Sequence, residues 1–111
     1  MNYKMRVIIK RPDEKYGHVA NISNSLENLQ RTVEGYIETI TIANSADGKP
    51  IILVCNEEGK LKGLPTNFWL WDEEIVGTVF LCSAEGDELT DLPLTFGLAE
   101  WKKLIDEMRW K

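Results

Sequence analysis

Apolar and polar residues alternate along the first ten positions of the chain. The apolar residues at alternate positions are Tyr3, Met5, Val7 and Ile9. Because successive side chains of a β-strand point to opposite faces of a sheet, this pattern predicts a strand with one face on the core. Arg11-Pro12-Asp13 ends the strand, and the stretch from Glu14 to Ala20 is expected to be a polar loop that could run extended through Val19.

Two later stretches carry apolar residues at helical spacing. The first has Leu26, Leu29 and Val33, and the second has Leu98, Trp101, Leu104, Ile105 and Met108. Both spacings predict a helix that packs one face on a core. Ser23 or Ser25 can cap the first helix and Thr95 the second, since a hydroxyl accepts from free N–H groups of the first turn. Gly35 suits the end of the first helix, because glycine tolerates a left-handed backbone.

Three apolar runs between the helices predict strands. Residues 36–42 are rich in β-branched and aromatic side chains. A turn at 44–48 separates them from residues 50–55, whose unbroken apolar run is typical of a strand covered on both faces. The third run is 75–82, in which Gly77 is expected to mark a bulge or a close backbone approach.

The predicted element order is β-α-β-β-loop-β-α within a single α+β domain covering residues 1–111. We expect about four strands in a mainly antiparallel sheet, with both helices packed on one face. Leu53 and Phe80 are expected to be core residues on adjacent or near-adjacent strands, because each lies within a run that is apolar on both sides.

The charge is negative overall and unevenly distributed. The net charge is −5, and no basic residue occurs between Lys62 and Lys102. This acidity argues against a general nucleic-acid-binding protein, because phosphate contacts need a surplus of Lys and Arg. No apolar run approaches the ~20 residues of a membrane span. Two cysteines without metal-binding spacing suit buried thiols in a reducing cytoplasm.

No combination of residues indicates a catalytic, cofactor or metal site, so we expect a protein that is not an enzyme. His18 is the single histidine and lies in a polar stretch, where a solvated role is the simpler interpretation. Cys55 ends a strand, but a reactive thiolate would need a nearby cation or a helix N-terminus. The segment 59–63 has glycines and lysines without the spacing of a phosphate-binding loop.

The connection from Asn56 to Trp71 is longer than two neighbouring strands need. Loops held on a rigid sheet are frequent binding sites, and exposed tryptophans are frequent in partner contacts. We therefore predict a partner-binding surface consisting of Lys60, Lys62, Asn67, Trp69 and Trp71. A structural loop whose tryptophans cover the sheet edge remains the competing interpretation. Trp110 could dock on the core or support a homodimer.

Several segments resemble one known family, the domain of unknown function 3846. They are Gly35-Tyr36-Ile37-Glu38, Cys55-Asn56-Glu57-Glu58-Gly59-Lys60-Leu61, Gly63-Leu64-Pro65, Asn67 and Ile75-Val76-Gly77-Thr78. The resemblance implies a setting in bacteriophages, conjugative elements and gut bacteria of the Firmicutes type. It also implies a relation to parts of large proteins thought to act against host defences. The family has no assigned activity, so the resemblance assigns no site residue.

Together these observations favour a small cytoplasmic binding domain of a mobile genetic element or its bacterial host. It would act through a protein partner, without nucleic acid, membrane or cofactor, and counter-defence is one such role. One alternative is a nucleotide- or small-ligand-binding domain that uses the 56–67 loop. Another is a self-association module.

Overall fold

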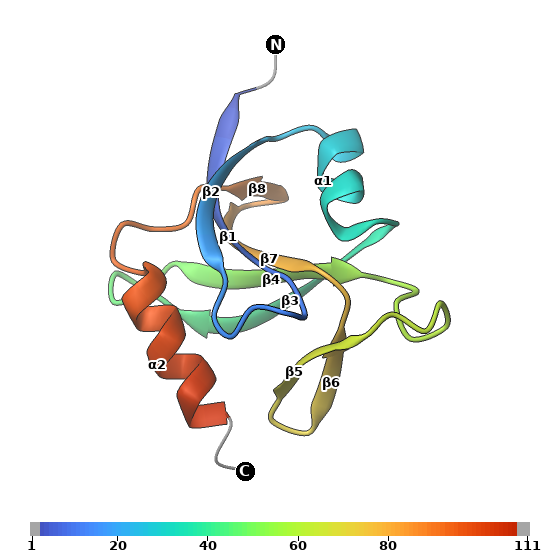
Figure 1. Ribbon diagram of the computed structural model, residues 1–111. Helices are drawn as coiled ribbons and strands as arrows, with labels where there is room; N and C mark the ends of the chain where they lie inside the picture. The colour runs from blue at the N-terminus through green and yellow to red at the C-terminus, as the bar shows by residue number, and fades with distance from the viewer. Residues whose placement is uncertain (1–2, 109–111) are drawn as a thin grey trace.

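The structure is a computed structural model that describes residues 3–108. Eight strands and two helices follow one another along this part of the chain (Figure 1). They are β1 (Lys4–Lys10), β2 (His18–Ser23), α1 (Leu26–Val33), β3 (Ile37–Asn44), β4 (Pro50–Asn56), β5 (Thr66–Leu70), β6 (Glu73–Val76), β7 (Val79–Glu85), β8 (Glu88–Thr90) and α2 (Leu98–Met108). The α+β class is confirmed, whereas the expected strand count and element order are wrong.

Six of the strands form one antiparallel sheet. Its order is β2-β1-β7-β4-β3, and β8 pairs with the end of β7. The segment expected to be a loop after β1 contains β2, which pairs with β1 from Lys4↔Ser23 to Ile9↔His18. The polar and small residues of β2 gave no strand pattern, because this edge strand is only partly buried.

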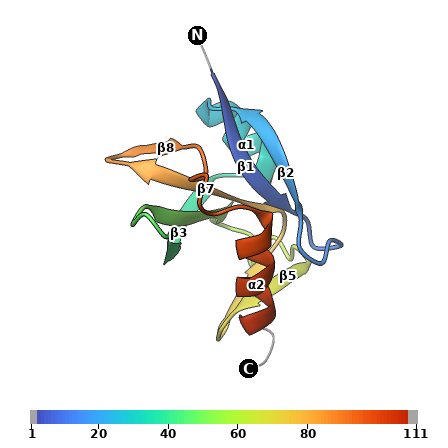
Figure 2. The ribbon, with the colours of Figure 1, turned by 90° about the vertical axis from the view of Figure 1, so that its left-hand side faces the viewer.

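The helices cover opposite faces of the sheet, so the expectation that both pack on one face is wrong. Leu29 and Val33 of α1 pack in one cluster with Phe80, whereas Trp101 and Ile105 of α2 pack in another with Leu53 and Leu81. Figures 1 and 2 show α1 and α2 on either side of the central strands. Neither helix of the described chain is long and apolar enough to cross a membrane.

β4 and β7 are the centre of both clusters. Leu53 and Phe80 are fully buried, and their strands pair directly with Val54 opposite Phe80. Leu53 faces the α2 side and Phe80 the α1 side. The prediction that both residues lie in the core on adjacent strands is therefore confirmed, and the unbroken apolar runs reflect burial on both faces.

The single strand expected over 75–82 is two strands that meet at a corner. Gly77 has a φ of 75°, and its N–H donates to the carbonyl of Pro65 over 2.8 Å. A Cβ at this position would lie 2.7 Å from Cδ1 of Leu64. The predicted close backbone approach at Gly77 is thus confirmed, and the corner directs β6 out of the main sheet.

The ends of α1 differ partly from expectation. Ser25 caps the helix, with its hydroxyl accepting from the N–H of Asn28 over 3.2 Å. The left-handed residue at the other end is Glu34, with a φ of 65°, rather than Gly35. Gly35 is needed for a different reason, since a Cβ there would lie 2.5 Å from the side-chain nitrogen of Asn56. That nitrogen donates to the carbonyl of Val33, which ties the helix end to β4.

Thr95 does not cap α2. Its hydroxyl donates to Asp47 instead. The helix begins after Gly97, whose N–H donates to the Glu100 carboxylate over 2.8 Å. The hydrogen bond from Gly97, followed by one from the N–H of Glu100 itself, lowers the pKa of the Glu100 carboxyl group. A carboxylate in the first turn of a helix also interacts favourably with the helix dipole.

Candidate functional site

β5 and β6 form a separate two-stranded hairpin that projects from the main sheet (Figure 1). Leu70 pairs with Glu73, so Trp71 and Asp72 form a two-residue turn. Phe68 and Ile75 anchor the hairpin in the core, and the Phe68 ring meets Trp101 edge-on at 5.6 Å between centroids. Phe68 to Leu70 is extended within β5, and the chain turns at Trp71.

Both tryptophans of the hairpin are exposed. Trp69 has 53% and Trp71 43% of its surface accessible, whereas Trp101 is completely buried. Trp71 also has a φ of 52°. A positive φ is uncommon for a bulky residue, and glycine or asparagine is the usual choice in such a turn. The hairpin thus holds a large apolar side chain where a small residue would fit the backbone better.

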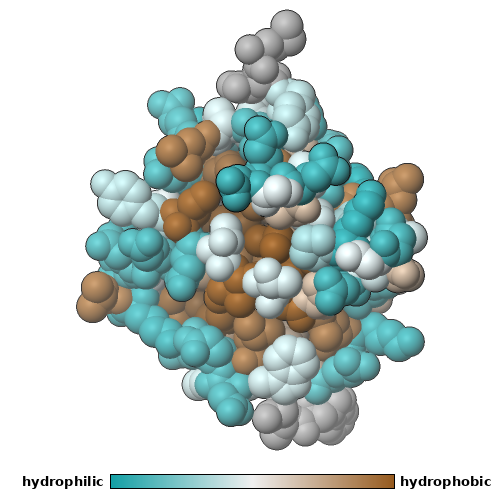
Figure 3. All heavy atoms as spheres, turned by 180° about the vertical axis from the view of Figure 1, so that it is seen from behind, coloured by the Kyte–Doolittle hydropathy of each residue, from teal (hydrophilic) through white to brown (hydrophobic). Residues whose placement is uncertain are grey.

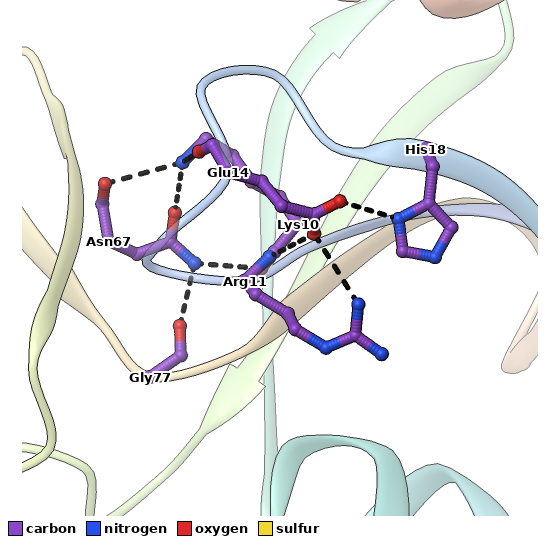
Figure 4. A network of polar contacts seen from close by, with 6 residues as sticks. All are labelled: Lys10, Arg11, Glu14, His18, Asn67 and Gly77. Carbon is purple, nitrogen blue, oxygen red and sulfur yellow. Dashed lines mark hydrogen bonds and ion pairs between the residues drawn. The ribbon is translucent and has the colours of Figure 1, made fainter.

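The base of the hairpin is fixed by a polar network around Lys10 and Asn67 (Figure 4). Nζ of Lys10, a residue only 2% exposed, donates to Oδ1 of Asn67 over 2.6 Å and to the carbonyl of Glu14 over 2.7 Å. Nδ2 of Asn67 donates to the carbonyls of Lys10 and Gly77, over 2.8 and 2.7 Å. One amide therefore joins the end of β1, the start of β5 and the corner before β7.

Glu14 extends this network toward β2. Its carboxylate accepts from the N–H of Arg11 over 2.9 Å and lies 2.8 Å from Nδ1 of His18. Partial burial raises the pKa of Glu14, but the Arg11 N–H, the His18 ring and the Arg11 charge together outweigh burial and lower it. His18 thus begins β2 instead of lying in a loop, and its side chain, which is 42% exposed, contacts Glu14 while remaining accessible to solvent.

The structure separates the five residues predicted to bind a partner. Trp69 and Trp71 lie together on the outer part of the hairpin and line a hollow of about 440 Å³. The rest of its lining consists of Thr66, Asn67, Phe68, Ile105 and Met108. Asn67 contributes to the wall of this hollow, but its amide hydrogen-bonds within the protein. Sequence reasoning did not identify the α2 side of the hollow or the role of Lys10, because both depend on contacts between distant segments.

Lys60 and Lys62 lie away from the tryptophans. Lys60 is exposed and bonds the Glu73 carboxylate over 2.8 Å on the side of the hairpin that faces β3. Lys62 is also exposed, and its Nζ would lie 3.1 Å from a Cβ built at Gly35. The two lysines therefore do not form one surface with Trp69 and Trp71.

Both cysteines are buried, and their surroundings disfavour the thiolate, which is the reactive form. Burial raises the pKa of Cys82 to about 12. Burial, followed by the charges of Glu38 and Glu73, raises the pKa of Cys55 to about 11. Both are therefore neutral thiols near pH 7, in agreement with the structural role expected from sequence. Among residues 3–108, no group of three or more His, Cys, Asp or Glu side chains is placed to hold a metal ion.

The comparison with protein families gives one match. The model of the domain of unknown function (DUF3846) matches residues 5–105. The chain belongs to this family. The match includes the whole hairpin and α2 as far as Ile105, so the residues that line the tryptophan hollow fall within it, with the exception of Met108. No curated protein and no solved structure matches the chain. Trp110, considered above for docking or dimerisation, lies outside the described residues.

Proposed function

We propose that this DUF3846 domain is a non-enzymatic protein-binding domain that acts in the cytoplasm of a bacterium, on behalf of a mobile genetic element. The observation that carries the proposal is the pair of exposed tryptophans beside the hollow at the β5–β6 hairpin. Tryptophan is enriched among residues that dominate binding energy, because one ring removes a large apolar area from water on binding.

Three features support a binding role over a merely protective one. The hairpin is fixed at its base by the Asn67 amide, so little conformational freedom is lost when a partner docks. Trp71 occupies its position despite the positive φ, and such departures from favoured backbone geometry are concentrated at functional sites. The hollow beside the rings provides a concave surface for a partner side chain.

The test is partner capture by variants of the two tryptophans. Trp69→Ala and Trp71→Ala, made separately, should leave the melting temperature nearly unchanged and abolish capture of a single stoichiometric protein from a bacterial lysate. Leu94→Ala is the matched control, since Leu94 is 93% exposed and lies away from the hollow. If both tryptophan variants unfold, or if neither changes capture, the surface is structural.

Counter-defence is the role that we propose within this setting. The partner would then be a host defence protein, and expression of the domain should lower the efficiency of one defence system against phage. The Trp69→Ala and Trp71→Ala variants should lose that effect in parallel with capture. Loss of capture without any change in phage resistance would contradict the counter-defence role while leaving the binding role intact.

The alternatives make different predictions. A nucleotide site at residues 56–67 would need free cations, but Lys60 is bonded to Glu73, and carboxylates rim the adjacent cleft. A nucleotide-specific thermal shift would support it nevertheless. A self-association module would show a dimer by light scattering, with neither a partner nor a nucleotide effect.

A further inference from the structure

β3 is an outer strand of the main sheet with an open edge. It pairs with β4 on one side, and no strand within residues 3–108 pairs with it on the other. The carbonyl of Tyr36 accepts from the N–H of Glu57, opposite it on the β4 side. Since backbone groups alternate in direction along an antiparallel strand, Ile37, Thr39 and Thr41 turn their N–H and C=O groups outward.

A cleft of about 460 Å³ lies beside this edge, between the main sheet and the side of the hairpin that faces away from the tryptophan hollow. Its floor is apolar and consists of Ile40, Cys55, Leu70, Ile75 and Val76. Side chains alternate along β3, so Glu38 and Ile40 share the cleft face and Thr39 lies on the opposite face. Figure 2 shows β3 on the left, which is the side that lies at the back in Figure 1. Figure 3 shows the molecule from behind, and this face has an apolar centre and a hydrophilic margin.

The rim of the cleft is acidic. Four carboxylates line it, those of Glu38, Glu57, Glu73 and Glu74, with Lys60 as the basic residue in its lining. The hydrogen bond that Lys60 donates to Glu73, together with the charges of Glu73, Glu74 and Glu38, raises the pKa of Lys60 against an opposing effect of desolvation. The negative charges of these carboxylates therefore add together within the cleft and favour the binding of a cationic group there.

We propose that the β3 edge and the cleft bind an extended peptide segment of a partner protein, which adds to the sheet as a further strand. Its main chain would pair with the outward groups of Ile37, Thr39 and Thr41. A Lys or Arg side chain opposite Glu38 would enter the acidic rim, and an apolar side chain opposite Ile40 would contact the floor. When a peptide adds to a sheet as a strand, its backbone hydrogen bonds give affinity, and its alternate side chains give specificity.

Charge complementarity selects this occupant over a second copy of the chain. Pairing two β3 edges would bring two acidic clefts to one interface, and like charges across strands are unfavourable. Charged residues and a bulge also protect sheet edges from aggregation, and β3 has Glu38 and a register shift after Thr41. Protection alone does not account for an apolar cleft beside the acidic residue. The proposal is independent of the tryptophan surface.

The test begins with a random heptapeptide library panned against the domain. We expect enrichment of peptides that have a basic residue and an apolar residue two positions apart, because that spacing places both side chains on the same face of a strand. The strongest peptide would then be synthesised with a fluorescent label, in a normal form and with N-methylated backbone amides. Its affinity should fall at least tenfold on N-methylation and weaken with added salt. Failure to enrich basic residues, or equal binding of both forms, would overturn the proposal.

Variants of the domain separate backbone from side-chain effects. Thr39→Pro removes an outward N–H, and proline is tolerated on edge strands. This variant should lose at least tenfold in affinity, whereas Thr39→Val should bind normally. Glu38→Gln should weaken binding several-fold and reduce its salt dependence. Equal affinity of Thr39→Pro and Thr39→Val, both folded, would contradict strand addition. If Thr39→Pro does not fold, the N-methylated peptide decides the same question.

Two further results would assign the edge differently. Peptide binding that is lost in Trp69→Ala or Trp71→Ala but kept in Glu38→Gln would place the peptide in the tryptophan hollow and overturn this site. A dimer by light scattering that Thr39→Pro converts to a monomer would show that a second copy covers the edge. Unchanged peptide binding by the two tryptophan variants would support two separate surfaces. The role of the tryptophan surface is then decided by the partner-capture experiment alone.

Discussion

At the level of single residues, the pairing of Lys10 with Asn67 shows how position decides a side chain's role. Lys10 ends an alternating strand and would be expected to reach solvent, yet it is 2% exposed. Oxygens of Asn67 and Glu14 accept its hydrogen bonds, so the buried ammonium group remains solvated by the protein itself. A buried charge with such partners is tolerated, whereas one that loses them is strongly destabilising.

Asn67→Ala should therefore lower the free energy of unfolding by about 1–3 kcal/mol, because it leaves buried polar groups without partners. The carbonyls of Lys10 and Gly77 and the Lys10 ammonium lose bonds together. Urea unfolding measures the change. Asn21→Ala, at an exposed position of β2, is the control and should change stability by less than about 0.5 kcal/mol. Equal effects of the two variants would contradict the structural role of Asn67.

The buried thiols predict a loss of stability at high pH. The folded state raises the pKa of Cys55 from 9.0 to about 11 and that of Cys82 from 9.0 to about 12. Below pH 9 both states are protonated, so these groups add no pH dependence. Above pH 9 the unfolded chain ionises first, and stability falls as the pH rises toward the folded values. Urea midpoints from pH 8 to 11 should fall more steeply for the wild type than for the Cys55→Ala, Cys82→Ala double variant. Parallel slopes would contradict burial of the thiols.

At the level of elements, the β5–β6 hairpin combines an anchored base with an unfavourable turn. A left-handed backbone costs a residue with a Cβ about 1–2 kcal/mol relative to glycine. Trp71→Gly should therefore be more stable than Trp71→Ala by about 1 kcal/mol, although both remove the same ring. Urea unfolding of the two variants provides the comparison. Identical stabilities would show that the turn holds Trp71 without strain.

The sequence predicts those elements whose burial is visible in the local pattern. The continuous apolar run of β4 indicates a strand that is buried on both faces, and the apolar stripe from Trp101 to Met108 indicates a helix with one buried face. β2 and β8 are short or partly exposed, and each becomes a strand only through its pairing partner, β1 or β7. The exposure of Trp69 follows from alternation with Phe68, but the α2 wall of the hollow depends on a crossover that no local pattern specifies. The same limit hid the opposite placement of the two helices.

At the level of the whole molecule, two small cores share the strands β4 and β7. Leu53→Ala should lower stability by about 2–5 kcal/mol, because Leu53 is fully buried and a cavity would remain beneath α2. Thr41→Ala is the control, at an exposed position of β3. Chemical unfolding of both variants measures the difference. A loss well below 1 kcal/mol for Leu53→Ala would contradict the central position of β4.

The overall charge predicts a second property of the molecule. With a net charge of −5, the domain should show no sequence-specific affinity for duplex DNA, because phosphate contacts supply most of such binding. Fluorescence anisotropy with labelled duplexes at 50–200 mM salt, about the range over which such contacts weaken, is the measurement. A salt-sensitive, submicromolar complex would contradict the prediction.

The position of β7 in the sheet has a consequence for the order in which the fold can form during synthesis. β7 pairs with β1, β4 and β8, yet it comes after β1, β2, β3 and β4 in the chain. During synthesis the chain emerges from the ribosome with its N-terminus first, so the β1–β2 and β3–β4 hairpins can form early. The edges of β1 and β4 that pair with β7 stay open until β7 inserts between them. Such open apolar edges can pair wrongly with other chains. The slow step of folding, and the period of greatest aggregation risk, should therefore be the wait for residues 79–85.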